Sequence, residues 1–346
     1  MSDDGDYRKV DPSRLEQLVT KLFSAAGVSD EDAQFMGHVL TDADLRGVHT
    51  HGTRFAPRYV EGLRADGTKA RPNRRLVVDA GAVGLYDGDG GLGHVAAAEA
   101  MEIAIRKAKE HGMGSVSVRR NGHCGAIAYY AQMAVDAGCL AFAATTGGTA
   151  IAPVGGIEAR CGLNPISWAA PTRRGWAFNL DMAPSVVAGS KVDMVRQRGE
   201  RLPWGWAIDA KGEPTDDPVA AREGGTLLPI GGYKGVGLSI AAEILCGVFS
   251  GSKFGETGGG SGHLFQAIDI EHVMPLDEFT ARMERMIEYV KSSALAPGSS
   301  GITLPGELEW QKRQEYTANG IPLDGPTRHG LREAAEEAGT PYDIEL

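Results

Sequence analysis

A single imidazole next to a sharp turn is the clearest sign of chemistry in this chain. His51 lies in the segment Val48-His49-Thr50-His51-Gly52. Histidine titrates near neutral pH, so its ring can both donate and accept a proton under ordinary conditions. A helical pattern runs from Ser29 to about Leu45 just before this segment, and Gly52 allows the backbone to turn after it. A histidine at such a helix–loop junction is a candidate general acid–base.

Two other chemistries must be weighed. His49 and His51 have the spacing of a metal pair, but no cysteine or carboxylate of ligand spacing accompanies them, so we predict no metal. The run Gly88–Gly93 fits G-x-G-x-x-G, the pattern of a dinucleotide turn, and the next predicted strand ends in Arg119-Arg120, which would suit NADP. A tight strand-to-helix connection needs the same glycines. We favour that second explanation, because a fold that binds a dinucleotide in this way rarely begins eighty residues into the chain.

Composition limits the function classes. The chain has 346 residues, a net charge of −10 and 42% hydrophobic residues. Nucleic acids and anionic membranes attract basic surfaces, so we expect neither as a partner. There is no apolar run of eighteen residues, and the first residues are acidic and polar, so we expect a cytoplasmic protein without a signal peptide. The four cysteines form no C-x-x-C pair, which favours reduced thiols in the core.

Hydrophobic periodicity predicts alternating strands and helices. Helices are predicted from Pro12 to before Gly27 and from Ser29 to Leu45. Further helices are expected over 95–111, 126–137, 184–198, 234–249 and 275–290, and the helix over 234–249 is apolar enough to be buried. Strands are expected over 83–87, 115–119, 140–145, 165–171, 176–182 and 264–270. This alternation indicates an α/β or α+β chain.

Several short motifs, taken together and in this order, carry a family resemblance. They are Leu45–Gly52, Asn121–Gly125, Pro153–Gly156, Gly162–Pro165, Asp181–Ser185, Gly232–Leu238 and Leu304–Glu307. Between about Leu15 and Asp324 the chain resembles the malate/L-lactate dehydrogenase family, which is unrelated to the Rossmann lactate dehydrogenases. That family includes ureidoglycolate dehydrogenase, diketogulonate reductase, sulfolactate dehydrogenase and cyclic-imine carboxylate reductases.

The resemblance implies a mixed α/β, non-Rossmann nicotinamide-binding fold with a largely antiparallel sheet flanked by helices. Residues 76–289 would form this sheet domain. Residues 1–75 together with 290–346 would form a helical domain for substrate and dimer contacts. A homodimer with active sites near the interface is expected, and the G-x-G-x-x-G match then becomes incidental.

The resemblance also assigns roles to individual residues. His51 would donate or accept the substrate proton, Thr50 would orient the ring or the substrate, and His123 would lie close to both substrate and nicotinamide. NAD or NADP would run along Phe178, Asn179, Leu180, Asp181, Met182 and Ala183, and would also meet Tyr233, Lys234, Gly306 and Glu307. Pro184 is expected to start a helix whose free N–H groups could meet a phosphate or carboxamide.

The chain departs from the family pattern where relatives bind a substrate carboxylate. Phe55 stands where relatives commonly carry an arginine; Arg54, Arg58 and Tyr59 lie nearby. Thr146 and Leu163 also replace the family's asparagine and threonine. The implied substrate is a keto acid, hydroxy acid or imine that is bulkier or less polar than malate or lactate. Two alternatives stay open: a Rossmann-type NADP enzyme using Gly88–Gly93, and a catalytically silent nucleotide-binding relative.

Overall fold

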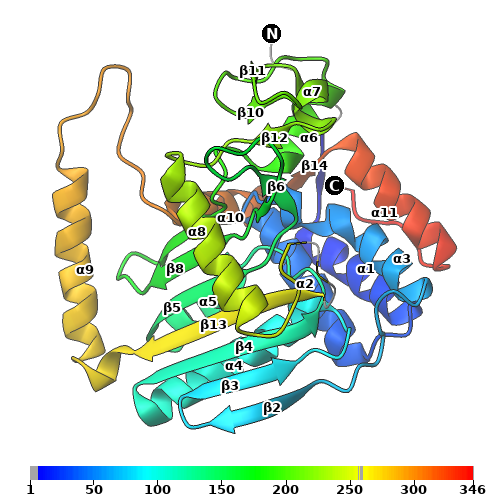
Figure 1. Cartoon of the computed structure of the whole chain (residues 1–346). Helices are drawn as coiled ribbons and strands as arrows, with labels where there is room; N and C mark the ends of the chain where they lie inside the picture. Colours follow the sequence, from blue (N-terminus) through cyan, green and yellow to red (C-terminus); the bar gives the residue numbers. More distant parts are fainter. Residues whose placement is uncertain (1–6, 256, 258–259, 346) are drawn as a thin grey trace.

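The computed structural model describes residues 7–255, 257 and 260–345, and a seven-stranded sheet lies at its centre (Figure 1). Neighbouring strands are antiparallel except β3 and β4, which are parallel and joined by helix α4 (Gly93–His111). The largely antiparallel sheet expected from the resemblance is therefore confirmed. The strands, in spatial order, are β2 (Arg75–Ala80), β3 (Val83–Asp87), β4 (Met113–Asn121), β13 (Ser261–Asp269), β5 (Cys139–Thr145), β8 (Ile166–Ala170) and β9 (Phe178–Met182).

Helices cover both faces of this sheet. On one face α4 and α5 (Ala128–Asp136) pack through small residues, since Ala97, Ala100 and Ala104 are fully buried and bring the α4 backbone close to the strands. On the other face lies α8 (Tyr233–Glu243), which continues as a π-helical turn, η3 (Ile244–Val248). Ala242 and Cys246 bury one side of this helix against β5 and β13. All four cysteines are buried and free, as predicted.

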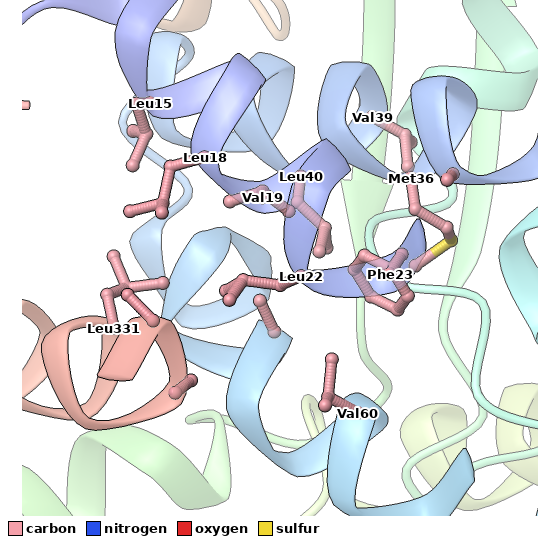
Figure 2. Close-up of a cluster of buried hydrophobic side chains, with 14 of the residues drawn as sticks. Leu15, Leu18, Val19, Leu22, Phe23, Met36, Val39, Leu40, Val60 and Leu331 are labelled. Atoms are coloured by element: carbon pink, nitrogen blue, oxygen red, sulfur yellow. The ribbon is translucent and has the colours of Figure 1, made fainter. Parts of the chain in front are cut away.

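A helical part packs beside the sheet around its own core (Figure 2). Asp11 and Ser29 cap α1 (Pro12–Ala25) and α2 (Asp30–Leu45) by accepting hydrogen bonds from the backbone N–H of Arg14 and Asp32. These two helices share leucine-rich faces with α3 (Ala56–Arg64) and α11 (Gly325–Glu337). Strands β1 (Arg8–Val10) and β14 (Ile321–Leu323) pair antiparallel. The division into two domains stays a prediction, and its residues 1–6 lie outside the described residues.

A second, five-stranded sheet was not predicted. Its order is β11 (Pro214–Thr215), β10 (Ala207–Ile208), β12 (Thr226–Leu227), β6 (Thr149–Ile151) and β7 (Cys161–Gly162), with α6 (Gly189–Gln197) and α7 (Pro218–Arg222) beside it. The helix predicted from Pro184 is wrong in its start, because it begins at Gly189. Backbone hydrogen bonds tie Pro184 O to Ile230 N and Val186 N to Leu228 O, each at 2.8 Å, and hold this segment extended.

Helix α9 (Leu276–Lys291) stands away from the body at the left of Figure 1, after the short turn η4 (Ile270–His272). Two arginines in the turn between β8 and β9 hold it. Arg173 Nε donates to Thr280 Oγ1 at 3.1 Å, and Arg174 Nε donates to Glu284 at 2.7 Å. A long loop then leads to α10 (Glu307–Asn319). Within the described residues no helix combines the length and the apolar character needed to cross a membrane.

Candidate active site

A buried carboxylate shapes the turn that carries His51. Asp44, in the last turn of α2, accepts hydrogen bonds from Thr53 N at 2.8 Å, Thr53 Oγ1 at 2.6 Å and His49 Nδ1 at 2.8 Å. These bonds fold the chain into two short 3₁₀ turns, η1 (His49–His51) and η2 (Thr53–Phe55). A side chain at Gly52 would overlap the Asp44 carboxylate, so only glycine fits there. Sequence reasoning missed Asp44, although a carboxylate shortly before two histidines was a usable signal.

The turn brings His51 against His123. The two imidazole rings stack with centroids 5.7 Å apart and planes inclined by 22°. Thr50 Oγ1 lies 3.0 Å from His51 Nδ1, so the hydroxyl fixes the ring. Desolvation lowers the pKa of His51 below its ordinary value of 6.5, and the positive charges of Arg46 and Arg54 add to that effect. His51 is therefore mostly neutral at neutral pH and reaches solvent in part.

His123 makes two contacts that fix its tautomer. Its Nδ1 lies 2.6 Å from the Tyr59 hydroxyl and 3.4 Å from Gly125 N. A backbone N–H can only donate, so Nδ1 is the acceptor, Tyr59 donates to it, and the proton of the ring sits on Nε2. Desolvation lowers the pKa of His123 to about 4 and raises that of Tyr59, so both groups are neutral. Although its neighbours crowd the ring, His123 is exposed to solvent.

Strand β9, predicted to line the cofactor, lies next to the His123 segment. The Asp181 carboxylate accepts a hydrogen bond from Ala128 N at 3.0 Å, and Asn179 Nδ2 donates to Ala128 O at 2.9 Å. Both side chains thus hold the first residue of α5, which follows His123 by five positions. Desolvation raises the pKa of Asp181 to about 6, although the residue reaches solvent. Phe178, Leu180, Met182 and Ala183 are half-buried on the same strand and its extension.

The start of α8 also adjoins β9. A side chain at Gly235 would approach Pro184 O to 2.6 Å, so the helix begins in close contact with the end of the Asp181–Pro184 segment. Tyr233 and Lys234, in the first turn, are exposed. Gly306, with φ +92°, packs against Ala177 and Asn179 at the start of β9. The Glu307 carboxylate is already engaged by Lys291 Nζ at 2.5 Å and by Leu304 N at 3.1 Å.

The predicted substrate residues fall into two groups. Phe55 lies 6.1 Å from His123 and 5.9 Å from Tyr59 between ring centroids, and Arg54 and Arg58 are exposed beside these rings. The other two residues, Thr146 and Leu163, make their observed contacts with different parts of the chain. Thr146 Oγ1 accepts a hydrogen bond from Gly262 N at 3.0 Å, and the partly buried Leu163 packs against the apolar cluster beside the smaller sheet.

Three of the four glycines in the turn Gly88–Gly93 pack against the protein's own chain, and Gly90 has open space beside it. A side chain at Gly88 would meet Asn121 Oδ1 at 2.8 Å, one at Gly91 would meet Pro72 Cγ at 2.5 Å, and one at Gly93 would overlap the His123 carbonyl. Arg119 and Arg120, which could have bound a ribose phosphate, pair with Asp87. The start of α4 is therefore covered, which contradicts the Rossmann-type alternative.

Comparison with known proteins decides the family. Residues 10–332 match the malate/L-lactate dehydrogenase family. The chain belongs to this family. It is 38% identical to a malate dehydrogenase of Pyrococcus horikoshii over 97% of both chains. It is 34% identical to an L-sulfolactate dehydrogenase of Methanocaldococcus jannaschii, covering 95% of this chain and 96% of the relative. It is 32% identical to an NAD(+) ureidoglycolate dehydrogenase of Escherichia coli, covering 91% and 92%.

Solved structures agree with this assignment. The structure of malate dehydrogenase from Pyrococcus horikoshii superposes with a TM-score of 0.90 at 36% identity, over 99% of this chain and 98% of the other. The protein is thus a dehydrogenase or reductase with the fold of its family, as the sequence predicted. In the described part of the chain, His, Cys, Asp and Glu side chains form no group of three or more that suits a metal ion.

Proposed function

We propose that this enzyme interconverts a 2-hydroxy acid and a 2-keto acid, or reduces a related carbonyl or cyclic imine, with NAD or NADP. The observation that carries the proposal is the stacked pair of His51 and His123, one ring able to exchange a proton and the other fixed as a hydrogen-bond donor. Reduction of a carbonyl requires a hydride, a proton for the heteroatom and a group that polarises the double bond. His51 supplies the proton, and His123 supplies the group that polarises the double bond.

The chain next to these histidines suits a nicotinamide dinucleotide. Lys234 is exposed in the first turn of an eleven-residue helix, where its own charge and the positive end of the helix dipole both favour phosphate. The same helix start touches the end of the Asp181–Pro184 segment. We therefore propose that the cofactor runs along Phe178–Ala183 and reaches Tyr233-Lys234. Gly306 packs against the start of this strand. When bound, the nicotinamide supplies the hydride or accepts it.

Residues of this chain transfer the proton and polarise the substrate. In reduction, protonated His51 donates its proton to the substrate oxygen or nitrogen, and in oxidation neutral His51 takes the proton back. Thr50 keeps the His51 ring in place through its hydroxyl. His123 remains neutral and offers its Nε2–H to the substrate heteroatom, because Tyr59 and Gly125 both donate to Nδ1. A neutral imidazole in this role polarises a carbonyl without competing for its proton.

The substrate site combines a cationic and an apolar element. Arg54 and Arg58 are exposed near the two histidines and are the groups we assign to the substrate carboxylate. Phe55 presents a half-buried ring beside Tyr59 and His123. An aromatic wall favours a substituent that is larger or less polar than that of lactate or malate. Faster turnover of oxaloacetate and pyruvate than of larger keto acids or cyclic imines would contradict this part of the proposal.

We also propose a homodimer, with the exposed side of α8 and η3 as its interface. Tyr233, Ile240, Ile244 and Val248 follow one another at helical spacing and are between 46% and 72% exposed. The helix predicted to be buried is thus buried on one side only, and a continuous apolar stripe of this kind marks an interaction surface. A second copy can cover it across a two-fold axis. Sedimentation should show a dimer that dissociates when Ile240 and Ile244 are both changed to glutamate.

One assay tests the proposed reaction directly. Absorbance at the reduced-nicotinamide band is followed while keto acids, hydroxy acids and imines are offered with each cofactor. The change His51→Gln removes the titrating group, so we expect kcat to fall at least about a hundredfold on the best substrate. His329→Gln, on the exposed surface of α11, is the matched control and should leave kcat unchanged. An unaltered kcat in the His51 variant would support a catalytically silent role for this residue.

The pH dependence should differ in sign between the two directions. Because the pKa of His51 lies below 6.5, the protonated form needed for reduction grows scarcer as pH rises, and kcat/KM for reduction should fall about tenfold per pH unit above that pKa. The neutral form needed for oxidation is saturated at neutral pH, so kcat/KM for oxidation should be level there and fall in acid. Initial rates between pH 5 and 9 measure both profiles. Parallel profiles in the two directions would contradict the assignment.

A further inference from the structure

Behind the Tyr59–His123 pair lies a residue that the proposed reaction does not use. His94, the second residue of α4, is 1% exposed, and neither of its ring nitrogens has a hydrogen-bond partner among the residues that the structure describes. A buried polar group without a partner is costly to the folded state. An aliphatic side chain would fill the space without that cost, so the presence of an imidazole here calls for a reason outside stability.

The contacts of the ring suggest that reason. Its centroid lies 5.1 Å from that of Tyr59 with the planes at 77°, and 6.2 Å from that of His123 with the planes at 80°. It is therefore nearly perpendicular to both rings of the hydrogen-bonded pair. Edge-to-face contacts are specific to aromatic rings, because the positive edge of one meets the negative face of another. An aliphatic side chain cannot impose this geometry.

Glycines on both sides make room for this arrangement. At Gly125, with φ +72°, a side chain would lie 2.6 Å from His94 Nε2. At Gly93, a side chain would overlap the His123 carbonyl. The last glycine of the G-x-G-x-x-G run thus brings the His123 backbone down onto the start of α4, directly beside His94. The space is narrow, and imidazole is the smallest aromatic ring that can fill it.

We propose that His94 is a positioning residue, whose ring holds Tyr59 and His123 so that Tyr59 donates to His123 Nδ1 and the Nε2–H faces the substrate. The inference rests on the proposed function, in which His123 contacts the substrate. Burial keeps the pKa of His94 well below its ordinary value, so the ring stays neutral among three other histidines and does not repel them. His94 itself neither touches substrate nor transfers a proton.

The test is the change His94→Leu, which keeps apolar volume and removes the ring. We expect the free energy of unfolding to stay the same or rise, because two unpartnered nitrogens disappear. We expect kcat to fall at least about tenfold with the cofactor Kd unchanged. The ¹⁵N resonances of His123, recorded on selectively labelled enzyme without substrate, should move from the Nε2–H tautomer toward a mixture of tautomers. A residue with a purely structural role would lower stability and leave those resonances in place.

A second variant keeps the test decisive. His94→Gln retains polar atoms without a ring, so it should shift the His123 resonances as the leucine variant does, including where the leucine variant fails to fold. His329→Leu, far from the site on α11, is the control and should change none of these quantities. Wild-type His123 resonances in either folded His94 variant would overturn the inference. The resonances are read without turnover, so failure of the proposed reaction would be seen separately in the assay.

Discussion

Two glycine-rich turns in this molecule lead into helices, and they differ in what occupies the space beside the glycines. Gly88–Gly93 leads into α4 and has the spacing of a dinucleotide turn, yet Asn121, Pro72 and the His123 backbone fill the positions where side chains at Gly88, Gly91 and Gly93 would stand, and only Gly90 has open space beside it. Gly231–Gly235 leads into α8 without that spacing. There Gly232, with φ +62°, has nothing within 4 Å of the position of a side chain, and Tyr233 and Lys234 are exposed.

The difference between the two turns shows how far a glycine pattern in the sequence can be interpreted. A glycine at a strand-to-helix turn indicates close approach of some other group, and the spacing alone does not say whether that group is a phosphate or the protein's own backbone. In the first turn the approaching group is the chain that carries His123. In the second, Gly235 packs against Pro184 and Ile230, but the side of the turn at Gly232 is open and leaves room for a ligand. We therefore assign packing to the α4 turn and cofactor binding to the α8 turn.

The largest effect that separates the two turns is expected for Gly93→Ala. The new methyl group would overlap the His123 carbonyl, so we expect a loss of about 3 kcal/mol in the free energy of unfolding, measured by chemical denaturation. Activity should fall as well, because the His123 loop must move. The folded fraction should keep its wild-type cofactor Kd. A stable variant that has lost only cofactor binding would reverse the comparison.

At the α8 turn the expected effect falls on the cofactor instead. Lys234→Ala removes an exposed charge from the helix start, so the cofactor Kd should rise about tenfold, in line with the loss of one charge-assisted hydrogen bond. The melting temperature should not change. Fluorescence titration of the reduced dinucleotide measures this Kd, and Lys21→Ala, an exposed change on α1, is the matched control. Equal cofactor Kd values for the Lys234 and Lys21 variants would show that Lys234 does not contact the cofactor.

The smallest effect is expected for Gly90→Ala. Gly90 has φ +72° and open space beside it, so the methyl group strains the backbone without touching anything. We expect a cost of about 1 kcal/mol in the free energy of unfolding and no change in the cofactor Kd. A dinucleotide bound at this turn would instead meet the new methyl group, and a marked rise in Kd would then revive the Rossmann-type alternative.

The sequence predicted the long elements of the fold well and the short ones poorly. Strands such as β3 and β5 and helices such as α4 and α9 have clear periodicity, and each was placed to within a few residues. The five-stranded sheet has strands of two or three residues, too short for any period to show. The wrong start at Pro184 has a different cause, since long-range hydrogen bonds to Leu228 and Ile230 override a good local helix signal.

The same division applies to the site. Thr50, His51, Tyr59 and His123 could be named from the sequence, and the structure brings them together. Asp44 and His94 were missed, because their importance lies in side-chain contacts that the local pattern only hints at. His94 left one usable sign, a polar residue in an otherwise alanine-rich helical face. Leu163 was assigned to the substrate from its motif alone; its side chain is partly buried against two small apolar clusters, and its contact with substrate stays a prediction.

A crystal structure of the enzyme with reduced dinucleotide and an unreactive keto acid analogue tests the central claim most directly. The account predicts a nicotinamide ring beside His51, the phosphates at Lys234 and the analogue's carbonyl oxygen within hydrogen-bond reach of both His51 and His123. A dinucleotide bound at Gly88–Gly93, or anywhere remote from the His51 ring, would contradict it.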